Sequence, residues 1–365
     1  MTTGGLHFKR IGAATLALSI LGAVGFGSSA SAQQPVRWKM QSAFGSNLPH
    51  LGPSAMRFID DVKTMSGGKF DIRFHEPGAL VPALECFDAV SKGSVDSCWT
   101  TPGYHTGKYP AAAFFTTVPF GPSLGEFLAW KWFGNGNKLR DEIYQKHGLI
   151  AFDCFCIGPE TSGWFKREIG SIDELKGLKM RFFGLGAKVM QKLGVSTQLL
   201  AGADIYPALE RGVIEATEFS MPMMDIKLGF HQIAKYNYFP GWHQQVSCSE
   251  FLVNRKTFDA LPANYKRMIQ VAANAQVSVT YAETEAMQFD QMAVMRDKHE
   301  VKIKRWSDDD LAKLERAWLD VIKEESAADP FFKKVADDYL GFRKKYAIWG
   351  EAQAMKPSYL NQKTQ

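Results

Sequence analysis

The chain has little of three features that would place it in a membrane, on a nucleic acid or among disordered proteins. After residue 32, no stretch approaches 18 uninterrupted apolar residues, the length expected of a membrane-spanning helix. Its 43 basic and 38 acidic side chains give a formal charge of only +5, without a Lys/Arg cluster. No low-complexity tract interrupts a composition that is 45% hydrophobic and 22% charged. We therefore expect a globular protein that is not membrane-embedded and binds no nucleic acid.

Cysteine is also scarce, and its number is odd. None of the five has the spacing of a metal finger: Cys86, Cys98, Cys154, Cys156 and Cys248. Cys154 and Cys156 alternate on a predicted strand, so they face one side and could form a poorly shaped disulfide. We favour the alternative that they are small core side chains.

Residues 1–32 have the pattern of a cleavable secretory signal. A basic start at Lys9-Arg10 precedes an apolar run from Ile11 to Phe26 and the small residues Ala30-Ser31-Ala32. A membrane anchor is the alternative, but the run is short and broken by glycines. We expect cleavage, export to the periplasm and a mature charge of +3, since the segment carries two basic residues and no acid.

The length of 365 residues predicts two domains, and the order of elements predicts an α/β fold. Apolar alternation and helical periodicity give two successive units in which strands and helices alternate, which favours parallel sheets with helices on their faces. The expected strands are 37–42, 70–74, 95–100, 149–155, 178–183 and 213–219. The expected helices are 49–65, 83–92, 133–146, 187–193 and 206–211.

Beyond Pro262 the pattern predicts helices alone. One long helix is expected over 264–297, a second is capped by Ser307, and a third starts at Asp329-Pro330 and ends near Trp349. A further capping box is predicted at Ser171-x-x-Glu174. These C-terminal helices must bury apolar faces on the parent domains or on a partner subunit.

One arginine stands out as a candidate ligand for an acid. Arg181 lies on the apolar strand 178–182, and Glu160 and Glu218 flank it in the sequence. A guanidinium offers a planar fork that matches a carboxylate. A solvated strand residue remains the alternative, because alternation places Arg181 opposite Met180 and Phe182. Two glutamates beside an anionic ligand would repel it without a cation, and the charge balance favours a divalent one.

Motifs spread over most of the chain resemble those of one family. They are Pro77-Gly78-Ala79-Leu80-Val81-Pro82, Asp88-Ala89-Val90 before Gly93, Val118-Pro119-Phe120-Gly121, Gly163-Trp164-Phe165-Lys166, Leu178-Lys179-Met180-Arg181, Gly212-Val213-Ile214 and Pro240-Gly241-Trp242. This ordered set resembles the solute-binding subunit of a TRAP transporter, in the DctP-like family. Within that family it is similar to the branch that binds 2-oxo and 2-hydroxy monocarboxylates.

The resemblance implies a two-lobe periplasmic binding protein fold with parallel or mixed sheets, a cleft between the lobes and long C-terminal helices. The expected boundaries are 33–155 for lobe I, completed by about 245–300, and 156–244 for lobe II. Helices over 263–350 pack on the lobes or on a dimer partner, so a homodimer is expected.

The resemblance also implies a ligand site. Arg181 grips the ligand carboxylate, and Glu218 with the backbone carbonyl of Phe219 binds a bridging cation, Ca²⁺ or Na⁺. Glu160 and Gln244 fall on two further positions that serve both ligand and metal. The family usually has an amide at the position of Glu160 and an acid at the position of Gln244. The number of carboxylates is therefore kept, but the negative charge lies at the other position.

Further pocket residues follow from the chain itself. Tyr104 is a candidate donor to a keto or hydroxyl oxygen. The candidate pocket walls are Trp99, Tyr104, Trp164, Phe182 and Trp242. His231 and His243 lack metal spacing, so we predict structural roles for both.

The expected function is capture of a small organic acid and its delivery to TRAP membrane permease subunits, with no catalysis. Two alternatives remain. Glu160 and Glu218 could act as the acid/base pair of an exported hydrolase. The chain could also be a chemosensory ligand-binding module, which the sequence does not separate from a transport protein.

Overall fold

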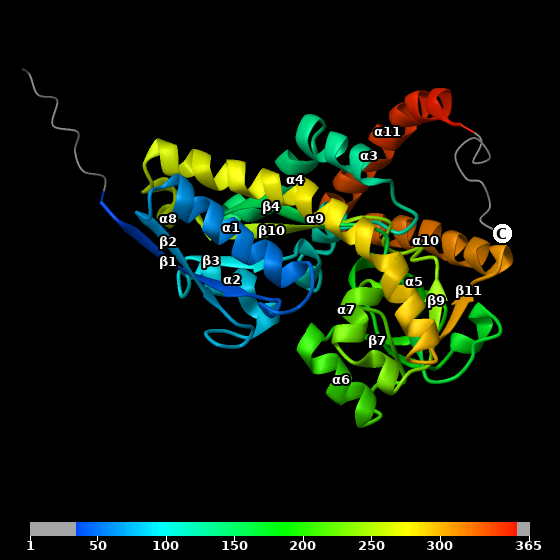
Figure 1. Ribbon diagram of the computed structural model, residues 1–365. Helices are drawn as coiled ribbons and strands as arrows, with labels where there is room; N and C mark the ends of the chain where they lie inside the picture. Colours follow the sequence, from blue (N-terminus) through cyan, green and yellow to red (C-terminus); the bar gives the residue numbers. More distant parts are fainter. Residues whose placement is uncertain (1–33, 356–365) are drawn as a thin grey trace, which may run out of the picture. The chain divides into compact units, whose positions relative to one another are not determined.

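The computed structural model describes residues 34–355, so the expected signal segment 1–32 lies outside the described residues. Two β-sheets organise this part of the chain (Figure 1). The first has the strand order β2-β1-β3-β10-β4 and the second β11-β9-β5-β8-β6-β7. Helices pack around both sheets, in agreement with the α/β expectation.

The first sheet is mixed. Its strands are β1 (Val36–Ser42), β2 (Phe70–His75), β3 (Ser97–Thr100), β4 (Leu149–Ile157) and β10 (Ser247–Asn254). The strands β1, β2 and β3 are parallel, whereas β10 runs antiparallel to both β3 and β4. Almost every residue of β4 and β10 is buried, which explains their near-continuous apolar sequence. The packing helices are α1 (Leu51–Met65), α2 (Cys86–Ser91), α4 (Gly136–Tyr144) and α8 (Arg255–Asp259).

The second sheet has six strands, and the sequence predicted only the two at 178–183 and 213–219. Its strands are β5 (Gly163–Phe165), β6 (Lys179–Arg181), β7 (Ser196–Gln198), β8 (Ala216–Thr217), β9 (Tyr236–Phe239) and β11 (Lys302–Arg305). β11 pairs in parallel with β9, so the expectation of helices alone after Pro262 is wrong. The short helices of this region are α5 (Gly184–Lys192), α6 (Gly202–Glu210) and α7 (Pro222–Lys227).

The chain passes between the two sheets three times. It leaves the first sheet after β4, returns at β10, and leaves again along α9 (Ala263–Asp297) to reach β11. The helix α9, yellow in Figure 1, packs against β4 and α1 beside the first sheet and against α7 beside the second. The boundaries 33–155, 156–244 and 263–350 stay a prediction.

The C-terminal helices follow the prediction closely. α10 (Asp308–Ala328) begins after Ser307, whose side chain accepts a hydrogen bond from the Asp310 backbone N–H. α11 (Pro330–Gln353) begins after Asp329, which caps two backbone N–H groups. These helices contact each other, α10 packs on α5, and α11 packs on η3 (Pro110–Phe115). Within residues 34–355, no helix is both long enough and apolar enough to span a bilayer.

The predicted capping box at Ser171 is wrong. The Ser171 side chain makes no cap hydrogen bond, and Glu174 Oε1 accepts from the backbone N–H of Gly170 instead. The reason is local: only a single 3₁₀ turn, Ile172–Leu175, follows Ser171, and the chain then turns at Gly177.

The cysteine interpretation is also corrected. Cys86 is bonded to Cys98, and Cys156 to Cys248, while Cys154 is a buried free thiol. Cys156 lies directly opposite Cys248 in the β4–β10 pair, so its partner is on the neighbouring strand and not two residues away. Only Cys154 keeps the expected role of a small core side chain.

Candidate functional site

A small cavity of about 40 Å³ lies where residues of both sheets meet. Since about 10–15 Å³ holds one water, this space accepts only a small solute unless the two lobes separate. One part of the lining is apolar or aromatic: Phe44, Leu51, Tyr104, Phe155, Ile157, Phe183 and Phe219. The polar part is Thr101, Glu160, Arg181, Ser220, Gln244, Ser247 and Ser249.

Arg181 is the last residue of β6 and is only 1% exposed, so the solvated alternative is wrong. Its Nε donates to the Leu200 carbonyl at 3.2 Å, and Nη1 donates to the Glu218 carbonyl and to Glu218 Oε1 at 2.7 and 2.8 Å. The guanidinium also lies 5.3 Å from the centre of the Phe219 ring. Its Nη2 has no hydrogen-bond partner within residues 34–355, so it can donate to a ligand in the cavity.

Glu218 is placed beside Arg181 by the sheet itself. It follows β8, which pairs in parallel with β6, and its Oε1 also accepts from the Phe183 backbone N–H. Burial alone acts to raise the pKa of Glu218, but the Arg181 guanidinium and His243 outweigh it and hold that pKa below its usual value. Glu218 is therefore a carboxylate at neutral pH.

Glu160 approaches from the loop after β4. Its backbone N–H donates to the Gln244 carbonyl at 3.1 Å, which joins the two loops that carry these residues. The Glu160 side chain is 3% exposed, and burial raises its pKa to about 7, although His243 acts in the opposite direction. The ring of Tyr104 lines the same cavity, and burial raises the pKa of Tyr104 to about 12, so its hydroxyl keeps its proton.

His243 joins this site, although the sequence analysis assigned it a structural role. Its Nε2 lies 3.6 Å from Glu160 Oε2 and 3.7 Å from Glu218 Oε2. Burial alone acts to lower the pKa of His243, but the two carboxylates raise it to about 9. Spacing could not show this, because the two glutamates are far away in sequence. The only available signal was its position directly before the pocket residue Gln244. His231 lies elsewhere, against His299.

Several polar atoms around His243 have no hydrogen-bond partner within residues 34–355. They are Glu160 Oε2, Glu218 Oε2, both His243 ring nitrogens, Gln244 Oε1 and Ser220 Oγ. One ligand atom each from Glu160, Glu218 and His243 lies within 4.8 Å of the others. Buried oxygen atoms without partners are costly, and a cation between them would satisfy them. The donor set therefore fits a bound cation.

Most of the predicted aromatic walls do not reach the cavity. Tyr104 lines it, whereas Trp99, Trp164, Phe182 and Trp242 are buried outside the lining. Trp99 stacks on Phe155, and the Trp164 indole donates to Asp225. Through Phe155, Trp99 supports the lining from behind.

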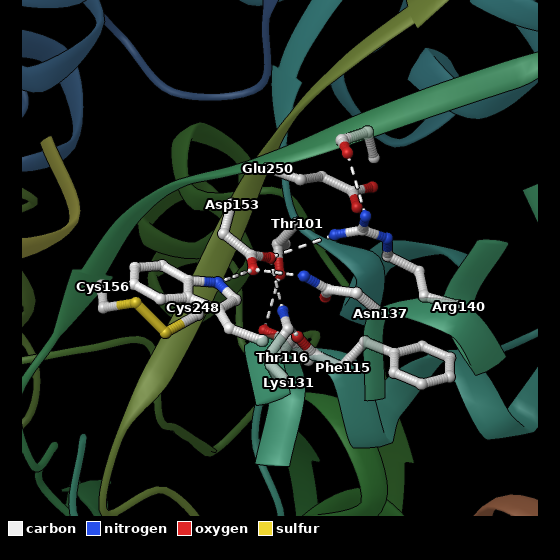
Figure 2. Close-up of polar contacts among 12 residues, drawn as sticks. Thr101, Phe115, Thr116, Lys131, Asn137, Arg140, Asp153, Cys156, Cys248 and Glu250 are labelled. Atoms are coloured by element: carbon white, nitrogen blue, oxygen red, sulfur yellow. Dashed lines mark hydrogen bonds and ion pairs between the residues drawn. A yellow bond between two sulfur atoms is a disulfide. The ribbon is translucent and has the colours of Figure 1, made fainter. Parts of the chain in front are cut away.

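A buried ionic cluster lies near the part of the cavity that is lined by residues of the first sheet. Figure 2 shows this cluster around Asp153 on β4. Lys131, Arg140 and Asp153 form it, with Asp153 Oδ1 at 2.6 Å from Lys131 Nζ and 3.1 Å from Arg140 Nη1. Lys131 also donates to the Phe115 carbonyl. Thr116, the next residue, is hydrogen-bonded to Thr101 and Ser247, two residues of the cavity lining. The cluster is thus connected to this end of the cavity through Phe115 and Thr116.

Comparison with known proteins finds relatives that match most of the chain. A monocarboxylate 2-oxoacid-binding periplasmic protein of Nostoc is 34% identical over 336 residues, which cover 92% of this chain and 91% of the relative. A TRAP solute-binding protein of Bordetella bronchiseptica, solved as a dimer with calcium and picolinate, is 31% identical with a TM-score of 0.85 over 88% of this chain and 95% of that one.

Two further solved relatives contain pyruvate. The TRAP periplasmic protein of Pseudoalteromonas atlantica, solved with sodium and pyruvate, is 30% identical with a TM-score of 0.84 and covers 88% of this chain and 97% of that one. The protein of Colwellia psychrerythraea, solved with calcium and pyruvate, is 31% identical with a TM-score of 0.83, at 88% and 98% coverage. The profile of the bacterial extracellular solute-binding proteins of family 7 matches residues 45–328. This chain therefore belongs to that family, DctP, and has the two-lobe fold of TRAP solute-binding proteins.

Proposed function

We propose that this chain captures a small 2-oxo or 2-hydroxy monocarboxylate in the periplasm, together with a cation, and delivers it to TRAP permease subunits. The observation that carries the proposal is the buried Arg181 guanidinium, which lines a small cavity. The relatives that bind 2-oxoacids, picolinate or pyruvate support this class of ligand. Membership of a solute-binding family does not favour the hydrolase alternative.

Arg181 would hold the ligand carboxylate through a charge-assisted hydrogen bond in a site with little water. The hydroxyl of Tyr104 would donate to the keto or hydroxyl oxygen on the next carbon. Phe183 and Phe219 would exclude water and limit the size of the side chain that the cavity accepts.

A cation would be held by the side chains of Glu160, Glu218 and Gln244 and by the backbone carbonyl of Phe219. It would bridge the carboxylates to the anionic ligand and offset the charge that the ligand brings. Capture is a population shift: contacts to Arg181 on the second sheet and to Tyr104 near the first exist together only when the lobes are closed.

Export and assembly complete the proposal. Cleavage after residue 32 would release the chain into the periplasm, where the permease is the partner. Apolar side chains on α11, with Ile348 76% and Trp349 60% exposed, support a homodimer through the C-terminal helices. Light scattering of the mature protein tests this, and a monodisperse monomer would remove the dimer from the proposal.

A chemosensory role would leave uptake of the solute unchanged when the gene is deleted, whereas a transport role requires that uptake to stop.

The Arg181→Lys variant tests ligand capture. Lysine keeps the charge but loses the planar fork, and a hydrogen bond to a charged group is worth about 1.5–3 kcal/mol, so we expect at least about 10-fold weaker binding. Calorimetry with pyruvate, 2-oxobutyrate and lactate, in Ca²⁺ and in Na⁺, measures it.

The matched control is Arg167→Lys, because Arg167 is exposed and pairs with Glu174, and neither residue lines the cavity. Circular dichroism verifies that both variants fold. Undiminished binding by a folded Arg181→Lys variant would contradict the proposal.

A further inference from the structure

We propose that Phe44 and Phe219 set the length of the solute, and that they restrict the protein to short 2-oxo acids such as pyruvate and 2-oxobutyrate. The proposal rests on the proposed function, because it concerns which acids of that class the cavity accepts. Both side chains line the cavity of about 40 Å³ that contains Arg181, and both also line a second cavity of about 400 Å³. They are the two residues that these cavities share, so their rings lie at the boundary between a small space and a much larger one.

The second cavity suits an aliphatic chain. Six apolar residues line much of it: Ala43, Leu48, Pro77, Ala201, Ala203 and Leu228. They come from the loops after β1 and β2, from the start of α6 and from the end of α7. Its two charged residues, Glu76 and Lys227, have opposite signs, so the space gives no net attraction to a second carboxylate on the solute. An uncharged hydrocarbon chain is therefore the group that this space would accept best.

Phe219 is held at the boundary by its neighbours. Its ring centre lies 5.3 Å from the guanidinium carbon of Arg181, and the side chain is only 7% exposed. A Cβ added to Gly202, at the start of α6, would come within 2.9 Å of the Phe219 ring. Because the ring already lies against the backbone at Gly202, it has no room to move towards α6 when a longer solute enters.

Phe44 packs among aromatic rings next to the group that would hold the keto oxygen. Its ring centre lies 6.0 Å from that of Tyr104 and 5.9 Å from that of Phe155. An acid held by Arg181 and Tyr104 therefore lies close to both Phe219 and Phe44. A longer chain on that acid could reach the second cavity only by displacing one of these two rings.

The other phenylalanine rings of the lining have protein behind them. Phe155 stacks on Trp99, which is 0% exposed. Phe183 lies so close to Gly103 that a Cβ at that position would be 2.0 Å from the tip of its ring. Neither Phe155 nor Phe183 lines the second cavity. Removal of either ring would enlarge the small cavity locally, whereas removal of the Phe44 ring would join it to the larger one.

The test is Phe44→Ala, and Phe183→Ala is its matched control, because each removes one phenylalanine ring from the same lining. Calorimetry of the full mature proteins with pyruvate and with 2-oxooctanoate, both in Ca²⁺, gives the ratio of the two affinities. Wild type should prefer pyruvate. The ratio should move towards 2-oxooctanoate at least about 10-fold further in Phe44→Ala than in Phe183→Ala, because each methylene buried in the second cavity adds about fourfold in affinity.

A second variant covers the case in which Phe44→Ala does not fold, which circular dichroism would show. Phe219→Leu shortens the other ring at the boundary and leaves the backbone carbonyl of residue 219 in place, so it should move the ratio in the same direction. A crystal structure of the folded variant with 2-oxooctanoate should show the hydrocarbon chain beside Leu48 and Ala201, in the second cavity.

The proposal would be overturned by a ratio that moves equally in Phe44→Ala and Phe183→Ala, or in neither. Wild-type protein that binds 2-oxooctanoate as tightly as pyruvate would also overturn it. Pyruvate binding separates these outcomes from failure of the proposed function. If wild type binds pyruvate and Arg181→Lys weakens that binding, the proposed function stands and only the role of Phe44 and Phe219 falls.

Discussion

His231 is a histidine that its surroundings keep neutral. Burial, with His299 and Lys235 nearby, lowers the pKa of His231 from 6.5 to about 4. Its Nδ1 has no hydrogen-bond partner in the described part of the chain. The residue therefore makes stability depend on pH in a range where most carboxylates have not yet been protonated.

We expect His231 to contribute a fall in the free energy of unfolding as the pH drops from 6.5 towards 4. A group whose pKa is lower in the folded state binds protons more readily once unfolded, so acid favours unfolding in this window. His231→Gln should make the fall shallower. Urea denaturation at steps of pH measures both proteins, and parallel curves would contradict the prediction.

The charges in the cavity show what the sequence could and could not predict at this scale. Arg181 was identified by its place on an apolar strand and by the family resemblance, and the structure brings Glu218 against it. The charge balance made from the sequence omitted His243, because nothing local marks a residue whose partners lie in other loops. With the pKa of His243 raised to about 9, the cavity side chains are balanced before any ion binds.

Among the secondary-structure elements, α10 offers a direct comparison of two predicted caps. Ser307 Oγ accepts from the Asp310 backbone N–H and donates to the Asp310 carboxylate, whereas the Ser171 side chain caps nothing. Ser307→Ala should lower the free energy of unfolding by about 0.5–2 kcal/mol.

Ser171→Ala is the matched control and should change it by less than about 0.5 kcal/mol. Urea denaturation of the ligand-free proteins measures both variants. Equal losses would show that the Ser307 hydrogen bonds contribute nothing specific.

Long helices with a regular apolar repeat were predictable from the sequence. Short strands that form only by pairing with a strand distant in the sequence were not. The expected helix 264–297 differs from α9 by one residue, because its apolar repeat covers many turns. β11 was missed since Lys302–Arg305 contains a single apolar residue, and only β9 makes it a strand. The disulfide between Cys156 and Cys248 depends in the same way on the pairing of two strands separated by most of the second sheet.

At the scale of the whole molecule, a close contact near the cavity tests lobe closure. Gly103 follows β3 of the first sheet, and Phe183 follows β6 of the second. A Cβ on Gly103 would lie 2.0 Å from the tip of the Phe183 ring. Gly103→Ala should therefore favour the open arrangement, and since overpacking costs about 1–3 kcal/mol, ligand affinity should fall by about 10-fold.

Gly107→Ala is the control, because no atom lies within 4 Å of its added Cβ. Calorimetry gives the affinity, X-ray scattering gives the ligand-free dimensions, and denaturation shows whether the fold itself suffers. If Gly103→Ala binds pyruvate as tightly as Gly107→Ala, the contact does not control closure.

The placement of β10 has a consequence for how this protein could be divided. β10 lies between β3 and β4, yet it is encoded after the whole of β5 to β9, and the edge strand β11 comes later still. A gene fragment that stops before Ser247 would lack an interior strand of its first sheet, and one that stops before Lys302 would leave β9 unpaired along one side. Neither sheet is encoded by one continuous segment, so neither can be exchanged with that of a relative through a single junction. Chimaeras of this protein need at least two junctions.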